Sequence, residues 1–167
     1  MCTRYLPILL FGVVVAALTL PACTNPREGY EPSQPIAFSH ELHAGTNQIP
    51  CGYCHVGQGE GPHASVPGVN TCMNCHSLVK TESPEIQKIH SAWKSGEPIK
   101  WVKVHDLPDH ARFSHQPHID HGFECAECHG KVEEMPVVAI QNPFNMGWCI
   151  GCHRENNGPQ DCVTCHY

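Results

Sequence analysis

Five copies of the pattern Cys-x-x-Cys-His constrain the fold of this chain more than any other feature of its sequence. They lie at residues 51–55, 72–76, 125–129, 149–153 and 162–166 and are numbered motifs I to V. They contain all of the 12 cysteines except Cys2 and Cys23. A disulfide-rich domain would space its cysteines irregularly, and a zinc ribbon would not need a histidine after every pair. The uniform spacing therefore favours covalent attachment of c-type haem.

Each motif supplies the groups that attach one haem. The two thiols form thioethers with the haem vinyl groups, and the histidine that follows ligates the iron. We therefore predict five covalently bound haems c, which would also supply apolar bulk to a chain with 15 prolines and 14 glycines. The expected attachment residues are Cys51, Cys54, Cys72, Cys75, Cys125, Cys128, Cys149, Cys152, Cys162 and Cys165. The expected proximal ligands are His55, His76, His129, His153 and His166.

Distal ligands are expected among the nine other histidines. Two pairs, His40 with His43 and His115 with His118, each lie just upstream of a motif. Residues three apart share one face of a helical turn, so each pair can ligate two neighbouring irons. His105, at the end of an apolar stretch, is the expected fifth ligand.

Other candidates for iron ligation carry less weight. Met135 and Met146 form an alternative, because a thioether ligand in place of one histidine would raise a haem potential; otherwise they fill gaps between haems. His90 is expected to be packed or solvated on a helix. The remaining histidines lie among Pro, Gly and Asp and are weaker candidates still: His63, His110 and His121.

The motifs belong to an internal repeat. Phe38-Ser39-His40-x-x-His43 precedes motifs I and II, Phe113-Ser114-His115-x-x-His118 precedes motifs III and IV, and motif V closes the chain. We expect a pentahaem domain at 36–167 made of related halves, 36–80 and 113–167, joined by 81–112. The expected fold class is a multihaem cytochrome c with short α-helices and loops wrapped around haems and little or no β-sheet.

Two elements are expected in the joining segment. Residues 83–95 show helix signals, with Ser83 as cap, Pro84 at the first position, and Ile86, Ile89 and Trp93 on one face. Gly96 would end this helix. Apolar and polar residues alternate briefly at 101–105, which predicts a short strand.

The N-terminal residues 1–22 form the main hydrophobic block, which predicts a membrane anchor helix or a lipoprotein signal. In the second case Cys23 would carry the lipid. Arg4 precedes the apolar run and orients that end inward, so the body is expected at the outer, periplasmic face of the bacterial cytoplasmic membrane. Residues 23–35 would be a linker. The formal net charge of −6 offers no basic patch, so we expect no nucleic acid partner.

Three stretches resemble the pentahaem cytochrome subunit of alternative complex III, a quinol-oxidising membrane assembly. They are residues 38–55, Val104-His105-Asp106-Leu107-Pro108-Asp109, and Asn145-Met146-Gly147-Trp148 with motif IV. The likeness extends from residue 36 to the end, and paired histidines are also similar to class III cytochromes. The resemblance implies an iron–sulfur or molybdopterin-like partner subunit, multispanning membrane subunits, and a downstream cytochrome c, copper protein or oxidase.

We expect an electron-transfer subunit that is not an enzyme by itself. The alternative is a stand-alone, membrane-anchored multihaem carrier. An enzyme of the multihaem nitrite-reductase kind would need one open iron site, often marked by lysine in place of the motif histidine. All five motifs keep histidine, which argues against that class.

Overall fold

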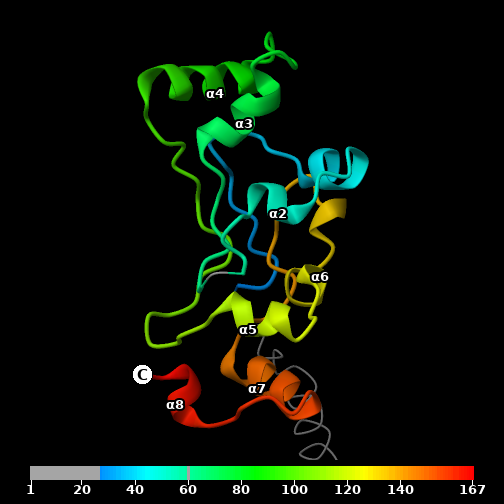
Figure 1. The fold of residues 1–167 in the computed structure, drawn as a ribbon, viewed down its shortest axis with the longest axis vertical. Helices are drawn as coiled ribbons and strands as arrows, with labels where there is room; N and C mark the ends of the chain where they lie inside the picture. Colours follow the sequence, from blue (N-terminus) through cyan, green and yellow to red (C-terminus); the bar gives the residue numbers. More distant parts are fainter. Residues whose placement is uncertain (1–26, 60) are drawn as a thin grey trace, which may run out of the picture.

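The computed structural model describes residues 27–59 and 61–167 (Figure 1). The predicted anchor at 1–22 and the lipidation candidate Cys23 lie outside these residues. Within the described part, no helix has both the length and the apolar character that crossing a membrane requires.

Short helices and long connections form the described part of the chain, and strands are absent from it. The fold class expected from the sequence, with little or no β-sheet, is confirmed in this respect. Figure 1 shows α3 and α4 at one end of the long axis and α7 and α8 at the other. The helices in chain order are η1 (a π-helix, Glu41–Thr46), α2 (Cys51–Cys54), α3 (Val69–His76), α4 (Pro84–Ser95), α5 (His115–Asp120), α6 (Cys125–His129), η2 (a 3-10 helix, Val132–Glu134), α7 (Met146–Glu155) and α8 (Cys162–Cys165).

Helix α4 forms where the sequence predicts it. It begins at Pro84 and ends at Gly96, whose φ of 75° is the left-handed conformation that glycine adopts without strain. Ile86 and Ile89 are buried and pack with Ile36 against α3, whereas Trp93 is 55% exposed. The apolar face of α4 is therefore narrower than the sequence indicates.

The strand expected at 101–105 is absent. The amide and carbonyl groups of Val102 are both bonded by the side chain of Gln34, at 2.9 Å each. The Gln34 side chain thus supplies the hydrogen bonds that the backbone of a neighbouring strand would otherwise make with Val102. Alternation alone misidentified the segment, because no second strand is available to pair with it in the described residues.

The segment 27–36 lies along the domain. The Arg27 guanidinium donates to the Asp106 carbonyl at 2.6 Å, and Gly29 and Tyr30 exchange backbone hydrogen bonds with Ile140. Ile36 ends the segment in the small core. The described part of the predicted linker is therefore bonded to the domain at several points.

The two predicted halves contact each other through η1 and η2, which pack together. The Glu41 amide donates to the Met135 carbonyl, and the His115 amide donates to the Gly61 carbonyl at 3.1 Å. The Gly45 position in η1 is closely approached, because a Cβ there would collide with the Glu133 carbonyl oxygen. Only glycine allows this approach of the two backbones.

Candidate haem-binding sites

All five motifs form helical turns. Helices α2 and α8 span the first four residues of motifs I and V, and α6 spans the whole of motif III. Motif II ends the longer helix α3, and motif IV lies within α7. The two cysteines of each motif, three residues apart, therefore lie on one face of a turn. The ten motif thiols are free, as attachment to haem vinyl groups requires.

A second imidazole faces each of the five motif histidines. An iron between two imidazoles, with metal–nitrogen bonds of about 2 Å, separates the ring centres by about 6 Å. The observed separations match this value, so the residues fit haems with two histidine ligands. They are 6.4 Å for His40–His55, 6.1 Å for His43–His76, 6.3 Å for His115–His129, 6.0 Å for His118–His153 and 5.9 Å for His110–His166.

Hydrogen bonds select the ring nitrogen that is available to a metal. In seven of these ten imidazoles, Nδ1–H donates to a backbone carbonyl at 2.5 to 3.1 Å. This bond fixes the ring orientation and leaves the Nε2 lone pair free, as in metal-ligating histidines generally. The seven are His43, His55, His76, His115, His118, His153 and His166.

Burial keeps two further rings of this set neutral. Desolvation, together with the nearby charges of His55 and His43, lowers the pKa of His40 to about 4. Desolvation, followed by the charges of His105, His115 and His55, lowers the pKa of His129 to about 4. The Nδ1 atom of His40 is buried without a hydrogen-bond partner. Neutral imidazole is the form that binds metals, so these rings are suited to ligation.

A phenylalanine fixes each histidine pair in the same way. Phe38 stacks on His43 at 4.3 Å and meets His40 edge-on at 4.9 Å. Phe113 lies 4.8 Å from His118 and also 4.8 Å, edge-on, from His115. The repeat seen in the sequence is therefore a repeat in three dimensions. The sequence shows that a phenylalanine recurs in each copy of the repeat, but only the structure shows that it packs on both histidine rings.

The structure places His110, rather than His105, opposite the motif V histidine. His105 lies 4.5 Å from His129 with perpendicular rings, and its buried Nε2 has no hydrogen-bond partner. Long-range bonds hold the His110 segment on α8: the Arg112 amide donates to the Cys165 carbonyl and His166 Nδ1 donates to the His110 carbonyl, both at 2.7 Å. The sequence carried one weak signal for His110, namely that no histidine pair precedes motif V.

The remaining candidates do not face a motif histidine across the distance that an iron needs. His90 uses its own Nε2–H to donate to the His76 carbonyl at 2.7 Å, which occupies the nitrogen that would bind iron. His121 is exposed, with its Nδ1–H bonded within its own turn, and His63 is also exposed. Met146 is 67% exposed. The Met135 methyl lies beside Gly130, next to motif III, which already has its second imidazole.

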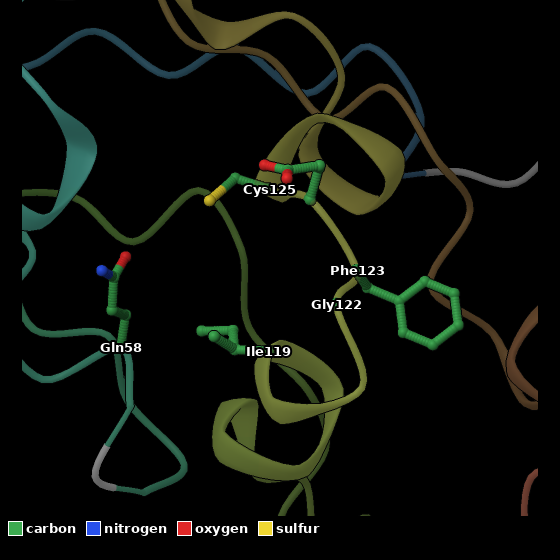
Figure 2. Close-up of a pocket in the computed structure, with 6 residues that line it drawn as sticks. Gln58, Ile119, Gly122, Phe123 and Cys125 are labelled. Atoms are coloured by element: carbon green, nitrogen blue, oxygen red, sulfur yellow. The ribbon is translucent and has the colours of Figure 1, made fainter.

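A cavity of about 210 Å³ opens beside motif III. Figure 2 shows the Cys125 sulfur pointing into it, with Gln58 from the first half and Ile119 from α5 on its other sides. The motif III thiol is thus accessible at a hollow where both halves meet.

Comparison with known proteins supports a multihaem cytochrome c. Residues 111–167 match the family model of cytochrome c7 and related cytochromes c. The chain is also 36% identical over 97 residues to the multihaem cytochrome c subunit of menaquinone reductase from Nitratidesulfovibrio vulgaris, strain Hildenborough. That alignment covers 58% of this chain and 45% of the relative, so the chain matches less than half of that subunit. Covalently bound c-type haem and a role in electron transfer are supported by both findings.

Proposed function

We propose that this chain binds five haems c, each between two histidines, and serves as the electron-relay subunit of a quinone-linked membrane complex. The observation that carries the proposal is the presence of five imidazole pairs at the separation that an iron requires. Bound haem would supply a one-electron couple at each pair. The menaquinone reductase subunit supports the link to quinone, and the resemblance to alternative complex III supports it independently.

The protein residues in this proposal hold and orient the cofactors. Motif cysteines fix one haem edge, and the carbonyl-bonded imidazoles present Nε2 toward the iron. The proposed distal ligands are His40 for motif I, His43 for motif II, His115 for motif III, His118 for motif IV and His110 for motif V. If each iron is held by two imidazoles, no position would remain for a substrate, and bond-making chemistry would belong to partner subunits.

Carbon monoxide tests whether the chain is a relay or an enzyme. Six-coordinate irons with two histidines should give no carbon monoxide difference spectrum in the reduced protein. Binding of carbon monoxide to one haem per chain would contradict the relay proposal and indicate an open site.

Purification from native membranes in mild detergent tests the assembly. We expect five haems per chain, measured against protein mass, together with an iron–sulfur or molybdopterin-like subunit and multispanning subunits identified by mass spectrometry. Addition of a reduced and of an oxidised quinone analogue would show whether electrons leave or enter the quinone pool. The second candidate, a stand-alone anchored carrier, would come off the membrane with five haems and no other subunit.

Mass spectrometry of the mature chain tests the form of the anchor. An intact Met1 would indicate an uncut anchor helix, and a diacylated Cys23 would indicate a lipoprotein.

A further inference from the structure

We infer that the five motifs are ordered in space as II–I–III–IV–V, which differs from their order along the chain. This inference rests on the proposed function, because it concerns haems held by the residue pairs described above. It makes motif I the neighbour of motif III, and it places motifs II and V at the two ends.

The histidine pairs give two links of this series. His40 and His43 lie on one turn but face His55 and His76 respectively, which joins motifs I and II. In the second half, His115 and His118 face the histidines of motifs III and IV in the same way.

The link between the halves runs through motifs I and III. The His115 amide donates to the Gly61 carbonyl, six residues beyond motif I, and His115 in turn faces His129 of motif III. His115 Nδ1–H also donates to the Pro62 carbonyl at 3.1 Å. The cavity beside Cys125 is also lined by Gln58, three residues beyond motif I. Motif II lies on the far side of motif I (Figure 1), where the Asn74 amide side chain of motif II donates to the Tyr53 hydroxyl of motif I at 3.1 Å.

The last links lie in the second half. Phe144 links motifs III and IV, because its ring lies 5.8 Å from that of His129 and 5.2 Å from that of Trp148, which directly precedes motif IV. His153 of motif IV donates through Nδ1–H to the carbonyl of Pro159, three residues before motif V. Figure 1 shows the same series along the long axis, with α3, α2, α6, α7 and α8 following one another from one end to the other.

Double-mutant cycles on haem potentials test the order. Neighbouring haems influence each other's reduction, so replacing a distal ligand at two adjacent haems should give non-additive shifts, whereas distant pairs should be additive. We expect His115→Met at motif III to be non-additive with His40→Met at motif I and additive with His43→Met at motif II. His43 is the matched control, because it lies on the same turn as His40. Potentials would be followed by redox titration monitored by electron paramagnetic resonance.

The order would be overturned if the potential shift of His115→Met were as non-additive with His43→Met as with His40→Met, or more so. That result would favour a spatial order that follows the chain, with motif II next to motif III. If His115→Met does not retain five haems, His115→Lys, which keeps a nitrogen ligand, repeats the test: it should couple to His40→Met and not to His43→Met. Failure of the proposed function is distinguishable, because the unaltered protein would then lack five haems before any cycle is measured.

Discussion

Replacing His110 tests the least expected member of the proposed ligand set. Its ring faces the His166 ring at 5.9 Å, with an interplanar angle of 23°. The bond that orients His166 goes to the backbone carbonyl of residue 110, so His110→Leu removes the distal imidazole and leaves the proximal one oriented. The haem should remain attached to Cys162 and Cys165 and lose only its sixth ligand.

The size of the effect follows from the number of sites. One of the five proposed irons would become five-coordinate, so about a fifth of the haem should change from low-spin to high-spin, and the other four haems should stay low-spin. Electron paramagnetic resonance would measure the oxidised protein. Carbon monoxide titration of the reduced protein should reach about one molecule per chain, against none for the unaltered chain.

His105→Leu is the matched control for this experiment. His105 also contacts a motif histidine, but at 4.5 Å and with perpendicular rings, and His129 already faces His115. We expect this variant to keep five low-spin haems. A high-spin haem in His105→Leu together with an unchanged spectrum in His110→Leu would refute the assignment and restore His105 as the fifth ligand.

Three further predictions follow from the described contacts. Met135→Leu and Met146→Leu should leave every haem spectrum and potential unchanged, because each motif histidine already faces an imidazole; a shifted potential in either variant would show thioether ligation. Ile89→Ala should lower the free energy of unfolding by about 2–5 kcal/mol, since it empties part of the buried α4 face, and thermal denaturation would measure it; no loss would mean that α4 is not packed as described. A hydrogen bond from Lys88, and after it one from a backbone amide, lowers the pKa of Glu85. Glu85→Gln should therefore reduce the melting temperature at neutral pH, and this difference should vanish as the pH falls through the lowered pKa. A difference that persists or grows in acid would contradict this pairing.

Local signals account for most of what could be predicted from the sequence. The motifs were identifiable because thioether attachment requires cysteines three residues apart and an adjacent histidine. Helix α4 was identifiable because Pro84, the periodic isoleucines and Gly96 are all local determinants. The histidine pairs could be predicted because a three-residue spacing places both rings on one turn.

The features that could not be predicted from the sequence are those that depend on a distant part of the chain. Nothing near His110 in the sequence indicates that the Arg112 amide bonds to the Cys165 carbonyl, 53 residues further along the chain. The strand expected at 101–105 failed for the same reason, because the side chain of Gln34 bonds the backbone there. Spatial order among the motifs is also a tertiary property, since it depends on how the halves meet.

The six-residue repeat unit and the His110 site differ in how they are built. In the first unit, the Ser39 carbonyl accepts both the amide and the Nδ1–H of His43, and Phe38 packs on both rings. This short segment therefore orients two distal ligands by its own contacts, and it could be duplicated as a block. Motif V has no such unit, and its proposed distal ligand, His110, lies on a segment held by bonds to α8. Its distal ligand consequently depends on tertiary docking, and motif V should be the first to lose its sixth ligand when the fold loosens.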